Sequence, residues 1–195
     1  MRKRFRELAK QVIINLDLPT PIVFTEVYVE KAKKHFLCAH FKLDDFKMCL
    51  YDPKMGPDFI CRIDYHFNGL GCHISHFKTF VDYQGKGLGR KVYDLALAHA
   101  DSVGHRASHG YIMPTGEIKT FSNRAAYDEY DRIEYLKNTY ISLGNTITEL
   151  RNDVFEYEFN STWAPHERMS KLNIEEREFI RNCNQAHFDD MENIF

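Results

Sequence analysis

Residues 83–100 read YQGKGLGRKVYDLALAHA, with glycine at 85, 87 and 89 directly before a helical pattern. Glycine this close to a helix start costs conformational entropy on folding, so we infer that bare backbone is needed there. A strand that runs through glycines into a helix presents unpaired N–H groups and the positive end of the helix dipole. This arrangement suits a phosphate or diphosphate, with Lys86 and Arg90 adding positive charge. The alternative is a glycine-rich turn that simply ends a hairpin.

The glycine pattern narrows the choice of phosphate ligand. GKGLG contains neither the GxxxxGK[ST] of a P-loop nor GxGxxG, and no acidic residue follows where a ribose hydroxyl would need one. The sequence therefore disfavours a nicotinamide dinucleotide or a nucleoside triphosphate. It does fit Q-x-x-G-x-G, through Gln84, Gly87 and Gly89.

The segments around the loop predict a mixed α/β chain. Residues 58–67 alternate apolar and polar side chains, Asn68-Gly69 is a turn signal, and residues 72–83 return, which predicts an antiparallel hairpin. The helix after the loop has apolar residues at helical spacing and Gly104 as its natural end. Further predicted elements are a helix over 2–16, a strand within 105–113, a helix from about 122 to 136, strands at 145–150 and 153–159, and a last helix from Asn173, capped by Glu176, to about His187.

A second motif lies at the start of the helix near residue 122. NRAAYDEY places Asn123, Ala126 and Tyr130 in the pattern N-x-x-A-x-x-x-Y. Together with Q-x-x-G-x-G and the order hairpin, loop, helix, strand, helix, hairpin, the sequence resembles the GNAT superfamily of GCN5-related N-acetyltransferases. The resemblance implies an α+β fold with a mostly antiparallel sheet flanked by helices. It implies an acyltransferase domain over 1–159, with 160–195 as a C-terminal loop and helix extension.

The resemblance also implies an activity, direct transfer of an acetyl group from acetyl-CoA to an amine in a ternary complex. Backbone amides at Phe80 and Val81 would polarise the thioester carbonyl, and the Tyr130 hydroxyl would protonate the departing thiolate. Core packing is the alternative role for Tyr130. The coenzyme would contact Phe80, Val81, Gln84, Gly85, Lys86, Gly87, Leu88, Gly89, Arg90, Asn123 and Ala126.

A further requirement is a base that takes the proton of the ammonium. The family often uses a glutamate before the loop, but 72–83 contains none, so His73 and His76 are the candidates, with Asp64 and His66 behind them. Packed or surface rings are the alternative for each histidine. Residues 114–122 form a longer connection than the family pattern, and DRIEYL replaces the usual Gly-Phe after Tyr130. These departures keep open a GNAT-like module that binds a coenzyme or a protein without turnover.

A zinc site is the other chemistry that these residues suggest. Cys61, His66, Cys72, His73 and His76 are close in sequence, but their spacing fits no known zinc finger, and strand alternation sends neighbours to opposite faces. We therefore expect no metal.

Composition limits the partners and the compartment. The 195 residues are 44% hydrophobic with a formal net charge of −2, which disfavours nucleic acid without excluding a local basic patch. Five cysteines without CxxC spacing predict free thiols in a reducing cytoplasm, and no apolar run could span a membrane. The expected acceptor is an amine on a small molecule or protein, and a nucleic-acid base or aminoacyl-tRNA remains an alternative. The first and last helices could cover the sheet or form a homodimer contact.

Overall fold

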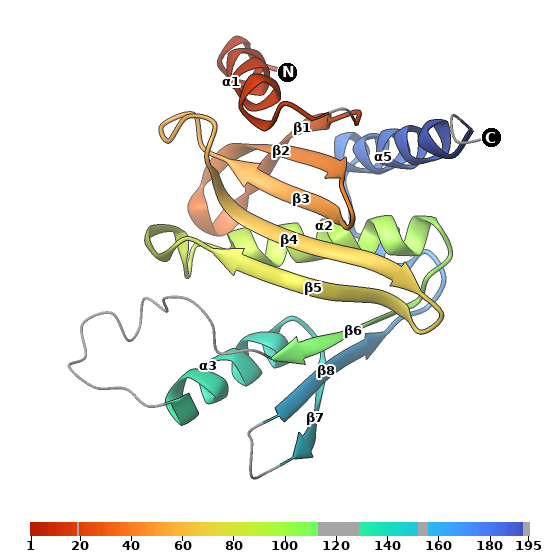
Figure 1. Ribbon diagram of the computed structural model, residues 1–195. Helices are drawn as coiled ribbons and strands as arrows, with labels where there is room; N and C mark the ends of the chain where they lie inside the picture. Colours follow the sequence, from red (N-terminus) through yellow and green to blue (C-terminus); the bar gives the residue numbers. More distant parts are fainter. Residues whose placement is uncertain (19, 113–128, 152–155, 193–195) are drawn as a thin grey trace.

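A single twisted sheet organises the chain (Figure 1). The computed structural model describes residues 1–18, 20–112, 129–151 and 156–192. Within these residues eight strands lie in the order β1-β2-β3-β4-β5-β6-β8-β7, and neighbours are antiparallel except for β5 and β6. The strands are β1 Val23–Val29, β2 Lys34–Lys42, β3 Phe46–Tyr51, β4 Phe59–Asn68, β5 Gly71–Thr79, β6 Ala107–Ile112, β7 Thr146–Arg151 and β8 Glu156–Thr162.

Helices cover the two faces of the sheet unequally (Figure 1). On one face, α2 (Leu88–Ser102) packs on β3, β4 and β5, and α5 (Ile174–Glu192) packs on α2, β1 and β2. On the other face, α1 (Lys3–Leu16) covers β2 and β3 through an apolar cluster around Phe5 and Val12. The other helices are α3 (Glu129–Ser142) and α4 (Glu167–Ser170). The face of β4, β5 and β6 opposite α2, which we call the open face, carries mostly polar side chains.

The predicted hairpin and helix after the glycine loop are both present. β4 and β5 pair as expected, and α2 begins at Leu88. β5 ends at Thr79 rather than Tyr83, because Val81–Tyr83 forms a 3-10 turn that carries the chain away from the sheet. The last helix runs further than predicted, to Glu192, and the first seven residues of the predicted helix 122–136 lie outside the described residues.

The C-terminal segment shares the main core. β8 runs to Thr162, and the following residues add buried apolar side chains to the cluster that α2 forms with the sheet: Trp163, Leu172, Phe179, Ile180 and Cys183. The predicted cap of α5 is confirmed, since Glu176 N donates to Asn173 Oδ1 at 2.9 Å and Asn173 N donates to Glu176 Oε2 at 3.3 Å. The C-terminal segment is therefore part of the packed core that supports the sheet.

β5 and β6 diverge, and this opening positions the site. Their parallel pairing is confined to Cys72↔Ser108 and His73↔His109. Figure 1 shows the two strands adjacent at the right of the view and apart at the left, where β5 leads to the glycine loop. Just past the last pair, Gly110 lies so close to Ile74 that an added Cβ would stand 2.7 Å from the Ile74 carbonyl oxygen. The closed end of the opening therefore lies at Ile74 and Gly110.

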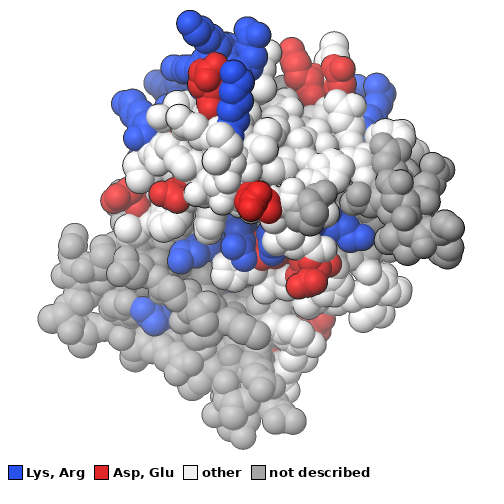
Figure 2. Space-filling view, turned by 45° about the horizontal axis from the view of Figure 1, so that its top comes forward, with Lys and Arg blue, Asp and Glu red and all other residues white. Residues whose placement is uncertain are grey.

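Charge is distributed unevenly over the surface. Figure 2 shows Lys and Arg side chains gathered over α1 at the top of the view. The surface therefore has a local basic patch although the net charge of the chain is close to zero. Among the described residues, no helix combines the length and the apolar character needed to cross a membrane.

Candidate active site

A pocket of about 770 Å³ lies in front of the glycine loop, within the range typical of small-molecule sites. Its floor is the end of β5 and the start of α2, and α3 forms one wall. The opposite wall comes from the β1–η1 junction, where η1 is Glu30–Ala32, and from the segment joining α4 to α5. Of the sequence-predicted coenzyme residues, the pocket lining includes Gln84, Gly85, Gly87, Leu88, Gly89 and Arg90.

The three glycines of the loop are required for two different reasons. Gly85 and Gly87 have φ of 75° and 83°, the left-handed region that other residues rarely adopt. A Cβ on Gly89 would stand 3.2 Å from the Phe77 ring, so glycine lets α2 approach β5 closely. The Gly85 position instead faces open space. The loop conformation thus depends on the glycines whether or not a ligand is bound.

The first turn of α2 presents to the pocket backbone donors that have no partner within the helix. The first helical bond runs from Lys91 N to Gly87 O at 3.2 Å, so the N–H groups of Leu88, Gly89 and Arg90 precede the helical ladder. The N-cap residue is Gly87, which has no side chain to accept from them. Donors of this kind, together with the helix dipole, can bind an anion in the pocket.

Gln84 fixes the loop to the open edge of β5. Phe80 N donates to Ile60 O at 3.0 Å, so by antiparallel alternation the N–H and C=O of Thr79 and Phe77 point away from β4. The Gln84 side-chain amide donates to Thr79 O at 3.1 Å, in agreement with this direction.

This pairing changes the expected oxyanion donors. The amide of Phe80 is already bonded to Ile60, and neither Phe80 nor Val81 lines the pocket. Phe77 and Thr79 line it instead. Lys86 also lies off the lining, with its Nζ 4.9 Å from the centre of the Tyr83 ring.

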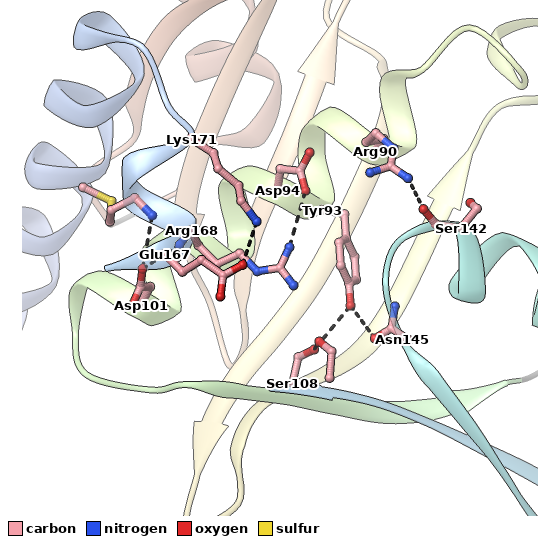
Figure 3. A network of polar contacts seen from close by, with 12 residues as sticks. Arg90, Tyr93, Asp94, Asp101, Ser108, Ser142, Asn145, Glu167, Arg168 and Lys171 are labelled. Carbon is pink, nitrogen blue, oxygen red and sulfur yellow. Dashed lines mark hydrogen bonds and ion pairs between the residues drawn. The ribbon is translucent and has the colours of Figure 1, made fainter. Parts of the chain in front are cut away.

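The pocket walls are held by a polar network (Figure 3). Arg90 donates to the Ser142 carbonyl at the end of α3, and Lys91 pairs with the buried carboxylate of Glu176 on α5. Lys171 pairs with Glu167 at 2.8 Å. The first two contacts join α2 to α3 and to α5, which are distant in sequence, and the third lies between α4 and the residue that follows it.

Asp101 anchors the short helix α4 below that wall. Its buried carboxylate accepts the backbone N–H of His166 at 2.9 Å, Arg168 at 3.0 Å and Met169 at 3.1 Å. Figure 3 shows Asp101 reaching from the end of α2 toward this turn. By accepting three backbone N–H groups at the start of α4, this carboxylate holds in place the segment that leads to Lys171.

The two candidate histidines lie away from the pocket lining, on the open face. The His73 ring is 4.7 Å from the His66 ring and 4.8 Å from the His109 ring. His76 pairs across the strand with Asp64, whose carboxylate binds Lys47 at 2.8 Å and Arg62 at 2.5 Å. Burial lowers the pKa of both His73 and His76 below the usual value. The neighbouring imidazoles act in the same direction on His73, and the positive charge of Arg62 does so on His76, whereas nearby carboxylates oppose the shift in both cases.

The remaining predicted site residues are only partly described. Asn123 and Ala126 lie outside the described residues. Tyr130 is the second residue of α3, and the structure describes its backbone only. The five cysteines are buried free thiols, and burial raises the pKa of every one of them, that of Cys61 to about 12, so none is poised as a nucleophile. Among the described residues, no group of three or more His, Cys, Asp or Glu side chains is arranged to hold a metal ion.

Several pocket residues were missed by sequence reasoning. Three come from distant segments that carry no motif: Tyr28, Lys31 and Lys171. Asn173 and Glu176 were recognised only as the cap of the last helix.

Comparison with known proteins rests on structure, since no protein-family model and no curated protein matches the sequence. A cAMP-binding acyltransferase from Mycobacterium smegmatis superposes with a TM-score of 0.57 at 14% identity over 94% of this chain. The chain has a GNAT-like fold. It spans 60% of that acyltransferase.

Two further solved structures are similar over less of the chain. A Desulfovibrio desulfuricans protein assigned to the GNAT acetyltransferases has a TM-score of 0.45 at 11% identity, over 62% of this chain and 69% of its own. PaiA N-acetyltransferase from Thermoplasma acidophilum, solved with coenzyme A, has a TM-score of 0.43 at 12% identity, over 62% of each chain.

Proposed function

We propose that the protein is an acyl-CoA-dependent N-acyltransferase that acetylates an amine on a small molecule or protein. The observation that supports this most is the uncapped start of α2, which opens into a large pocket lined by the end of β5, beyond the point where β5 still pairs with β6. An anion site joined to an open strand edge matches a substrate with a diphosphate at one end and an amide-bearing arm beyond it.

The described residues suit each part of such a substrate. The amides of Leu88, Gly89 and Arg90 would bind the diphosphate, and the amides of Phe77 and Thr79 would bind the arm along β5. Lys31 adds positive charge at the rim, and Lys171, which also pairs with Glu167, lies on the same lining. From Thr79 to His73 the strand covers about 20 Å at about 3.3 Å per residue. An extended pantetheine arm is of comparable length, so its thioester would reach the closed end of the opening.

The chemistry is direct transfer. The lone pair of the neutral amine attacks the thioester carbonyl carbon, the C–N bond forms, and the C–S bond breaks with its electron pair on sulfur. Amides on the open edge of β5 would hold the carbonyl oxygen as charge develops. Tyr130 would give its proton to the sulfur and regain one from the attacking nitrogen.

We expect Tyr130→Phe to lower turnover about 100-fold, the lower range for loss of a general acid, while the affinity for acetyl-CoA changes little. Free thiol release in the presence of an amine measures turnover, and thermal stabilisation by acetyl-CoA measures binding. Tyr157→Phe, on β8 outside the pocket lining, is the control. Full turnover in Tyr130→Phe would refute the acid role.

A GNAT-like module that binds a coenzyme or protein without turnover is the second candidate. The lack of a carboxylate between Gly71 and Thr79 on β5 favours it. Stabilisation by acetyl-CoA with no thiol release toward any amine would support this candidate over the enzyme.

A further inference from the structure

The outward face of α1 carries a row of basic side chains that the proposed function does not use. Lys3, Arg6 and Lys10 are exposed and recur at helical spacing, and Arg2 and Arg4 flank them. Figure 2 shows this gathering of Lys and Arg side chains over the helix. No residue of α1 lines the pocket, so this surface is separate from the candidate active site.

Two carboxylates oppose the positive charge of this helix. Glu7 is the only acidic residue of α1, and its carboxylate lies 3.2 Å from Lys10 Nζ, with both side chains exposed. Arg2 pairs at 3.3 Å with Glu26 on β1. The basic residues at 2, 3, 4, 6 and 10 outnumber these carboxylates, although the formal net charge of the chain is −2. A local excess of positive charge favours an anionic partner.

The same outward face ends in exposed apolar side chains. Ile13 is 49% exposed and Ile14 is 77% exposed, one turn beyond Lys10. By helical spacing, Lys3, Lys10 and Ile14 lie along one side of the helix. That side is opposite the one from which Val12 packs on the sheet. Basic side chains next to exposed isoleucines on one helix face are typical of a helix that lies in a lipid interface.

The packing of α1 determines which of its sides is available to a partner. Phe5, Leu8 and Val12 are buried against β2 and β3, so the wide apolar side of the helix is already occupied by the sheet. The helix would therefore meet a membrane with its outward side only and with its axis parallel to the surface. Long basic side chains reach the lipid phosphates in this position, while the isoleucines enter the boundary of the headgroup layer. Such contact is shallow and reversible.

We propose that the outward face of α1 binds the surface of an anionic lipid membrane. Lys3, Arg6 and Lys10 contact the lipid phosphates, and Ile13 and Ile14 enter the headgroup layer. The charge alone would also suit the phosphates of a nucleic acid, but that partner gives the two isoleucines no role. A lipid surface uses both features, since its negative charge attracts the basic residues and its hydrocarbon boundary receives the apolar ones. This inference does not depend on the proposed transferase function.

Co-sedimentation of the full chain with vesicles tests the role of charge. The probes are vesicles of phosphatidylcholine alone and vesicles that also contain about 30% phosphatidylserine. We expect binding to the anionic vesicles only, weakened more than about tenfold between about 0.05 and about 0.5 M NaCl, because salt screens the charges. Lys3→Glu should weaken this binding about 30-fold. Arg181→Glu makes the same charge change at an exposed position of α5, on the other side of the sheet, and should stay within about twofold.

The isoleucines separate a lipid surface from other anionic partners. Ile14→Asn should weaken binding to the anionic vesicles about fivefold, because an apolar side chain no longer leaves water on binding. Ile174→Asn is the matched control, since Ile174 is 78% exposed on α5, and it should bind the vesicles as the wild type does. Both side chains are exposed, so both variants should melt within about 2 °C of the wild type.

Ile14→Trp reports insertion directly. The sequence has one tryptophan, Trp163, which is 7% exposed, so a change in emission when vesicles are added reports the side chain at position 14. We expect a blue shift with anionic vesicles and none with phosphatidylcholine alone. The lack of this shift, equal binding to both kinds of vesicle, or no binding to either would overturn the proposal. Wild-type binding by Ile14→Asn together with loss in Lys3→Glu would indicate a surface for phosphate groups alone, such as those of a nucleic acid, and would also overturn it.

Discussion

We expect Gly85→Asp to weaken acetyl-CoA binding about 100-fold. Gly85 lines the pocket beside the start of α2, an added Cβ would meet no atom within 4 Å, and aspartate tolerates a φ of 75° better than most residues. The new carboxylate would stand near the bound diphosphate. Two like charges about 5 Å apart repel by about 3 kcal/mol at an effective dielectric constant of about 20, which is about 100-fold in affinity.

Gly85→Asn is the matched control, because it has the same shape and backbone cost without the charge. Titration calorimetry with acetyl-CoA should show a loss of about threefold or less for asparagine. Equal losses in the two variants would mean that the loop binds no anion and is only a structural turn. The comparison therefore separates charge from backbone strain.

We expect Asp101→Ala to lower the free energy of unfolding by about 3 kcal/mol. The substitution leaves three backbone N–H groups of the α4 start without their carboxylate, and bonds to a charged acceptor are worth about 1.5–3 kcal/mol each before solvent relaxation. For a chain of this size the melting temperature should fall by roughly 6–12 °C. Urea unfolding provides the free energy.

Two controls interpret that result. Asp101→Asn retains one acceptor oxygen and should lose about half as much. Glu7→Ala removes an exposed pair with Lys10 on α1 and should change stability by less than about 0.5 kcal/mol. A loss below about 1 kcal/mol for Asp101→Ala would show that α4 does not depend on this carboxylate.

Local patterns predicted the elements that surround the loop. The hairpin 58–83 and the helix from Leu88 depend on alternation, a turn signal and helical spacing, all of which act within a few residues. The end of β5 was wrong because Phe80 still bonds to Ile60 while the chain turns at Val81. Nothing local indicates that turn.

The site was less predictable because it depends on register and on distant segments. The extra residue of β5 decides that His73 and His76 share a face, and strand order decides that His109 lies beside His73. Lys31 and Lys171 reach the pocket from segments about 55 residues before and 80 residues after the loop. Sequence therefore predicted the loop that lines the pocket but not the walls of the pocket or the open amides of β5.

The central claim is that the amides at the start of α2 bind the diphosphate of an acyl-CoA. Backbone amide NMR of the full chain during titration with acetyl-CoA tests it most directly. We predict saturable shifts of the Leu88, Gly89 and Arg90 amides, with Phe77 and Thr79 following along β5. Saturable binding that leaves these five amides unmoved, or the lack of any binding, would contradict the claim.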